Sequence, residues 1–95
     1  MNIVWTRPAA RDLATIQDYI ARDNPAAAYR LATTVRRQVR QLADHPQLGR
    51  PGRLDGTREL VISDTPYLVP YRISDHRVEI LAVYHGARRW PERFD

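Results

Sequence analysis

Residues 58–85 read RELVISDTPYLVPYRISDHRVEILAVYH, and this stretch decides the fold. It contains three runs rich in β-branched and aromatic residues, which predict strands at 58–63, 67–74 and 77–85. The links between them are short and polar, so the stretch predicts an antiparallel meander. Pro70 has no N–H to donate to a neighbouring strand, and it therefore predicts a bulge or an unpaired edge inside the second run.

The register of the second and third runs follows if Asp75-His76 is a two-residue turn. Arg72 then lies opposite Glu79, and an opposite-charge pair across two strands is favourable. The other face of the hairpin is strongly apolar and is the expected seat of the helices. Strict alternation places Tyr84 on that apolar face, in the core, and His85 on the helix-free face.

The register of the first run depends on the length of its link. A three-residue link at 64–66 pairs Arg58 with Arg72 and brings both to the helix-free face with His85. A four-residue link turns Arg58 away from that face. Arginines beside a histidine are able to stabilise a phosphate and to move a proton, as RNA cleavage requires. A solvated sheet face with Arg72 paired to Glu79 is the structural alternative, and the residues leave both open.

The residues before this stretch predict one more strand and two helices. Residues 2–6 (NIVWT) are typical of a strand, and Thr6 and Asn24 are good N-caps for the two apolar-periodic segments that follow them. Residues 45–57 contain two prolines and three glycines and predict a loop. The expected class is α+β, with order β-α-α-β-β-β: an antiparallel two-helix hairpin packed on one face of a small, mainly antiparallel sheet.

The composition limits the chemistry. The chain has 95 residues, which suits a single domain over 1–95, and a formal net charge of +4. All 15 basic residues are arginine and there is no cysteine, so a lysine base, a cysteine nucleophile and a thiolate zinc site are excluded. His45 and His76 have no second ligand at metal spacing, and we expect no metal or cofactor. The absence of a signal-like segment fits a cytoplasmic protein.

Two groups of arginines remain as candidate binding residues. Arg88, Arg89 and Trp90 combine residue types that are enriched at binding hot spots, although Trp90 is also able to pack the tail onto the sheet. The row of Arg36, Arg37 and Arg40 is typical of a solvated helix face.

Five segments in succession resemble the RelE/ParE superfamily of bacterial toxins from type II toxin–antitoxin systems, and the ParE branch above all. They are ARDLATIQDYIARDNPAAAYRL, LADHPQLGRPGR, GTREL, PYLVPYRI and ILAVYHGARRWP. Each segment alone is a weak signal. Together the five segments cover nearly the whole chain, and their order is specific to this superfamily.

The resemblance implies a growth-arresting toxin, neutralised by a ParD-like antitoxin and able to bind operator DNA only through it. ParE-like members poison DNA gyrase without a catalytic residue, and Arg88, Arg89, Trp90 and Arg58 would be the target contacts. RelE-like members are ribosome-dependent mRNA endonucleases, and in that alternative Arg58, Arg72 and His85 would be catalytic. Whether the chain is an enzyme thus depends on its target. A second alternative is an inactive module that only binds antitoxin.

Overall fold

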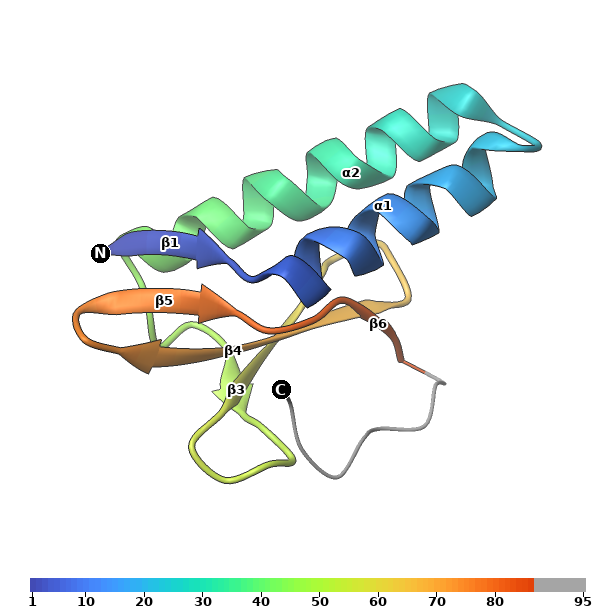
Figure 1. Ribbon diagram of the computed structural model, residues 1–95. Helices are drawn as coiled ribbons and strands as arrows, with labels where there is room; N and C mark the ends of the chain where they lie inside the picture. Colours follow the sequence, from blue (N-terminus) through green and yellow to red (C-terminus); the bar gives the residue numbers. More distant parts are fainter. Residues whose placement is uncertain (87–95) are drawn as a thin grey trace.

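The structure is a computed structural model that describes residues 1–86. In this part of the chain, two helices cover one face of a six-stranded sheet (Figure 1). The elements are β1 (Asn2–Trp5), α1 (Arg7–Ala21), α2 (Pro25–Arg40), the 3-10 helix η1 (Gln41–Ala43), β2 (Arg50–Pro51), β3 (Arg58–Val61), β4 (Tyr67–Ser74), β5 (Arg77–Ile80) and β6 (Tyr84–His85). The predicted α+β class and the helical hairpin are confirmed.

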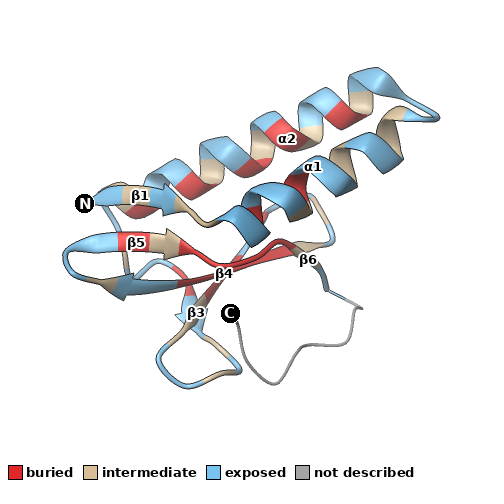
Figure 2. Ribbon diagram, viewed as in Figure 1, coloured by how far each residue is buried: buried red, intermediate tan, exposed pale blue. Residues whose placement is uncertain are grey.

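Both helices begin at the predicted caps. The Thr6 hydroxyl accepts a hydrogen bond from the Ala9 N–H at 3.3 Å, and the Asn24 side chain accepts one from the Ala27 N–H at 3.0 Å. Each cap is followed by a proline within the first two helical positions, where a missing N–H costs nothing. The helices pack side by side and direct their buried residues at the sheet (Figure 2).

The strand order is β1-β5-β4-β3-β2, and β6 pairs with the other end of β4. Pairings among β2, β3, β4, β5 and β6 are antiparallel, whereas β1 runs parallel to β5. The parallel pair is possible because both helices lie between β1 and the rest of the sheet in the chain, which gives the connection room to cross over.

Two turns fix the registers of the meander. Asp75 and His76 both have positive φ, 52° and 60°, as a type I′ hairpin turn requires, and the predicted pairing of Arg72 with Glu79 is confirmed. The link between β3 and β4 has four residues, because the Ile62 N–H donates to the Tyr67 carbonyl at 3.0 Å. Arg58 consequently pairs with Tyr71 and not with Arg72.

A bulge interrupts the pairing at Pro70, where the sequence predicted one. Tyr71 pairs with Ile80 and Leu68 pairs with Tyr84, so β4 advances three residues while its partner advances four. The extra residue shifts every later pair by one position and so exchanges the faces. The prediction that Tyr84 lies on the core face and His85 on the helix-free face is therefore wrong.

The core fills the space between the helices and the sheet. Its fully buried side chains include Val35, Val39, Leu42, Ile62, Val69, Tyr71, Val78 and Ile80. The Tyr71 hydroxyl donates to the Pro46 carbonyl at 2.7 Å and accepts from the Gly49 N–H at 2.8 Å, which ties the loop after η1 to the sheet. No helix within residues 1–86 is long and apolar enough to cross a membrane.

Candidate functional site

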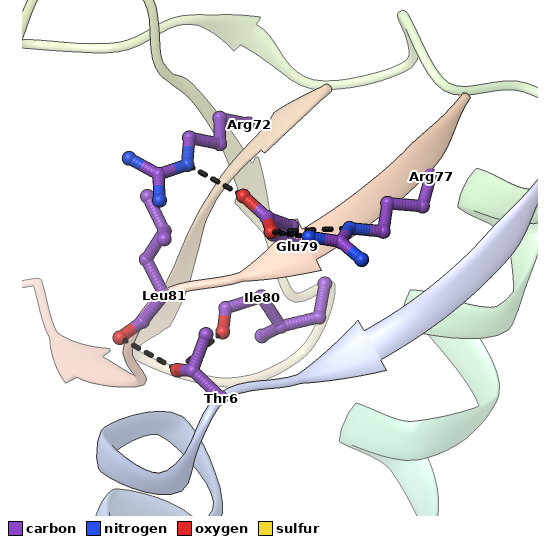
Figure 3. A network of polar contacts seen from close by, with 6 residues as sticks. All are labelled: Thr6, Arg72, Arg77, Glu79, Ile80 and Leu81. Carbon is purple, nitrogen blue, oxygen red and sulfur yellow. Dashed lines mark hydrogen bonds and ion pairs between the residues drawn. The ribbon is translucent and has the colours of Figure 1, made fainter. Parts of the chain in front are cut away.

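Arg72 lies on the sheet face away from the helices, in a cluster centred on Glu79 (Figure 3). The Arg72 Nε is 2.7 Å from Glu79 Oε1, and the Arg77 guanidinium approaches Glu79 Oε2 from the other side at 3.0 Å. The hydrogen bond from Arg72 is the main reason why the pKa of Glu79 is lowered from its ordinary value of 4.5, and Arg77 adds to the effect. This cluster neutralises much of the charge that Arg72 would offer to a phosphate.

Arg58 lies on the opposite face and is held by the loop after η1. Its Nε donates to the Gly49 carbonyl at 2.9 Å, and its Nη2 donates to the Gln47 carbonyl at 3.1 Å. These acceptors are neutral, so Arg58 keeps its full charge and is fixed in place by two bonds to the backbone.

His85 is exposed and lies on the side of the sheet that carries the helices. Its ring meets Tyr67 edge-on, with 5.6 Å between the ring centroids. Burial is the main reason why the pKa of Tyr67 is raised from 10.0, and the phenol of Tyr19 on α1 raises it further. The bulge therefore moves His85 into an aromatic cluster and away from the face that holds Arg72.

The predicted site residues are thus found at separate places. Arg58, Arg72 and His85 are not brought together: Arg72 shares a face with Glu79, while Arg58 and His85 each lie with other partners on the other side. Arg88, Arg89 and Trp90 lie outside the described residues.

An ion pair between a buried glutamate and an exposed arginine, which the sequence did not reveal, joins β2 to β3. Glu59 is only 3% exposed, and its Oε1 lies 2.6 Å from the Arg50 Nε. Its Oε2 has no hydrogen-bond partner among the described residues. The signal that could have found it is the charge pair itself, but the contact depends on a two-residue strand inside a predicted loop.

A groove runs between α2, β3 and the loop before β2. It has a volume of about 340 Å³, and it is lined by Gln38, Gln41, Leu48, Gly49, Arg50, Glu59, Leu60, Val61 and Ser63. Leu48 and Val61 are 51% and 46% exposed, which gives the groove an apolar floor open to solvent.

The outer edge of β3 faces this groove. β2 covers only Arg58 and Glu59, and the Gln38 amide covers Ser63 by accepting from its N–H at 2.9 Å and donating to its carbonyl at 3.3 Å. In an antiparallel ladder alternate residues point their backbone groups outward, so the N–H and C=O of Val61 face the groove between these two covers.

Comparison with known proteins identifies the family. The profile of the ParE toxin of the type II toxin–antitoxin system parDE matches residues 3–90. The chain belongs to this ParE toxin family. Among relatives of this ParE-family chain, a Sinorhizobium fredii protein named "Putative toxin Y4kP" is 49% identical over 91 residues, covering 96% of the chain and 94% of the relative. Toxin RelE2 of Caulobacter vibrioides is 38% identical over 87 residues, covering 92% and 97%.

Two solved structures share the fold of this ParE-family chain. A chain of the chromosomal ParDE toxin–antitoxin system from P. aeruginosa has a TM-score of 0.82 and 30% sequence identity, with 90% of this chain and 95% of that one covered. A chain of the toxin–antitoxin complex RelBE2 from Mycobacterium tuberculosis has a TM-score of 0.56 and 30% identity, with 88% and 95% covered.

Proposed function

We propose that this chain arrests growth by poisoning DNA gyrase in the cytoplasm and is neutralised there by a ParD-like antitoxin. The observation that carries the proposal is the family match over residues 3–90. It is supported by the better superposition on the ParDE system than on the RelBE2 complex, with TM-scores of 0.82 and 0.56.

A gyrase poison acts by binding, so it needs a contact surface and no catalytic group. The contacts we propose are Arg88, Arg89 and Trp90, with Arg58 as a further charge. Arginine and tryptophan carry a large share of the binding energy in protein interfaces. Arg58 is suited to such a contact because two backbone carbonyls already fix its guanidinium, which lowers the entropy lost on binding.

Gyrase supercoiling measured with the purified chain tests this proposal. The intact chain is expected to inhibit supercoiling and to leave linear plasmid, and Arg88→Ala/Arg89→Ala is expected to abolish both effects. Arg7→Ala/Arg11→Ala removes the same charge from the exposed surface of α1 and serves as the matched control. Equal loss in the two double variants would assign the effect to net charge, and an inactive intact chain would rule out gyrase as the target.

We propose that the antitoxin segment occupies the groove beside β3. Exposed Leu48 and Val61 offer apolar contacts, and the outward backbone groups of Val61, which no other described residue covers, allow an extended segment to add to the sheet. Expression of the chain should stop growth, and the product of the adjacent gene should restore it. Val61→Asp should weaken that rescue while the toxin stays active. Normal growth without antitoxin would instead support an inactive, antitoxin-binding module.

The alternative is cleavage of mRNA on the ribosome through Arg58, Arg72 and His85. The observation that favours this alternative is the 38% identity to a protein named Toxin RelE2. It requires the three side chains to reach one phosphate, whereas Arg72 is paired with Glu79 and His85 packs on Tyr67. Mapping of 5′ ends after induction separates the two: new ends inside translated messages would replace gyrase with the ribosome as the target.

A further inference from the structure

The arginines of the sheet and those of α2 differ in how the structure holds their side chains. Those of the sheet have a carboxylate or carbonyl acceptor within the protein: Arg50, Arg58, Arg72 and Arg77. Those of α2 are exposed, and in residues 1–86 none of their side chains has a hydrogen bond or an ion pair: Arg30, Arg36, Arg37 and Arg40. Of these two groups, the arginines of α2 are the ones whose charge is available to a partner.

These four arginines form one surface, which we call the α2 arginine face. The buried stripe of α2 consists of Ala28, Ala32, Val35 and Val39. Helical spacing places Arg30, Arg37 and Arg40 on the side of α2 away from this stripe, and Arg36 on the flank of the stripe. At a rise of about 1.5 Å per residue, they extend over about 15 Å along the helix axis. α2 contains no acidic residue, whereas in α1 two arginines are balanced by two aspartates.

Folding alone does not account for this surface. Arg36 and Arg40 are four residues apart, and Arg37 and Arg40 are three apart, so each pair repels along the helix. Arg37 and Arg40 lie in the last turn, where positive charge complements the helix dipole. Arg30 and Arg36 lie outside that turn and gain no such compensation. A polyanion bound from outside would compensate all four.

We propose that the α2 arginine face binds the phosphate backbone of duplex DNA, independently of base sequence. Guanidinium forks pair with phosphate oxygens through two hydrogen bonds, and several of them spread over one exposed helix surface are able to contact successive phosphates. Tyr29 is the one large apolar side chain exposed on this helix, in the part of the chain that the structure describes. A protein partner needs an apolar centre, and a single strand needs several stacking rings. This inference does not depend on gyrase being the target.

Fluorescence anisotropy with the full chain and a labelled duplex of about 20 base pairs tests the proposal, at salt concentrations from about 50 to 200 mM. The logarithm of the binding constant should fall linearly with the logarithm of the salt concentration. Arg30→Gln/Arg36→Gln should weaken binding and reduce the steepness of that line by about 1.8, because each lost phosphate contact contributes about 0.9. Circular dichroism should show the helices unchanged, since neither side chain holds another described residue.

Arg72→Gln/Arg77→Gln is the charge-matched control, because both guanidinium groups are already paired with the Glu79 carboxylate. It should leave the salt dependence unchanged. Equal changes in the two double variants would overturn the proposal in favour of net charge. So would tighter binding of a polyglutamate peptide or of single-stranded RNA than of the duplex, and so would an absence of DNA binding at the lowest salt concentration.

Discussion

Tyr71 is the residue at which the sheet, the helices and the long loop meet. Its ring is fully buried, and its hydroxyl bonds both the Gly49 N–H and the Pro46 carbonyl. Gly49 itself leaves no space for a side chain, because an added Cβ would lie 2.6 Å from the Tyr71 ring. The loop therefore takes its position from one hydroxyl group and one missing side chain.

The substitution Tyr71→Phe tests this anchoring role. It keeps the ring but leaves a buried N–H and a carbonyl without their partner, and we expect it to lower the free energy of unfolding by about 1–3 kcal/mol. Urea denaturation followed by circular dichroism measures the change. Tyr29→Phe makes the same chemical change at a side chain that is 70% exposed, and it should stay within about 0.5 kcal/mol of the parent. Equal effects would contradict the anchoring role.

Glu79 makes the stability depend on pH. Because its pKa is lowered in the folded chain, its ion pairs stabilise the fold above the unfolded pKa of about 4.5, and this contribution is lost as the pH falls through the folded pKa. Urea midpoints of the parent should therefore exceed those of Glu79→Gln at pH 7, and the difference should shrink below about pH 4.5. Asp55→Asn removes an exposed carboxyl that makes no ion pair with another described residue, and the same shrinkage there would contradict the assignment to Glu79.

At the scale of elements, the strand registers that could be predicted from the sequence were those set by short turns. Asp75-His76 fixed the pairing of β4 with β5, and it was predictable because a two-residue turn allows one register. The link before β4 was not, because three and four residues fit its composition equally well. This difference of one residue in the link decides whether Arg58 pairs with Arg72. The geometry of the candidate site could therefore not be predicted from the local sequence pattern.

The bulge limited the prediction in a second way. Pro70 indicated where the pairing of β4 with the following strand is interrupted, but not how many extra residues that strand contains at the bulge. The segment between β5 and β6, which gains the extra residue, makes a long-range contact. In it, the Asp12 carboxylate on α1 accepts a hydrogen bond from the Val83 N–H at 3.0 Å. Residues 71 positions apart in the chain carry no mark of such a bond, which is why Tyr84 and His85 were assigned to the wrong faces.

The two helix caps allow a matched prediction. The Thr6 hydroxyl caps α1 and also donates to the Ile80 carbonyl at 2.7 Å (Figure 3). The Asn24 side chain, in contrast, has only its cap bond from the Ala27 N–H among the described residues. Thr6→Ala should therefore lower the free energy of unfolding by more than Asn24→Ala does, within the range of about 0.5–2 kcal/mol that is usual for a cap. Thermal unfolding of both variants makes the comparison. A larger loss at Asn24 would show that the bond from the Thr6 hydroxyl to β5 contributes little.

At the scale of the whole molecule, charge is divided between two layers. The arginines of the sheet are bound internally, and those of α2 repel one another in a chain of net charge +4. Arg36→Gln should therefore stabilise the protein by about 0.2–0.5 kcal/mol at low salt. Arg72→Gln should destabilise it, because the Glu79 carboxylate loses its principal donor.

Differential scanning calorimetry at two ionic strengths checks both signs. The two effects should diminish at about 1 M salt, where the screening length is about 3 Å. A stabilising effect of Arg36→Gln that persists at high salt would point to helix propensity and away from repulsion.

The Gln38 amide on Ser63 has a consequence for how this protein behaves at high concentration. An uncovered edge strand is a template on which identical chains are able to stack into fibres. A carboxamide offers the same donor and acceptor as a peptide unit, so it occupies that template at one position without a second chain. Since a surface side chain changes rotamer in nanoseconds, the cover also yields readily to a competing strand. Gln38 thus disfavours stacking of identical chains on the edge of β3, while that edge stays accessible to a competing strand.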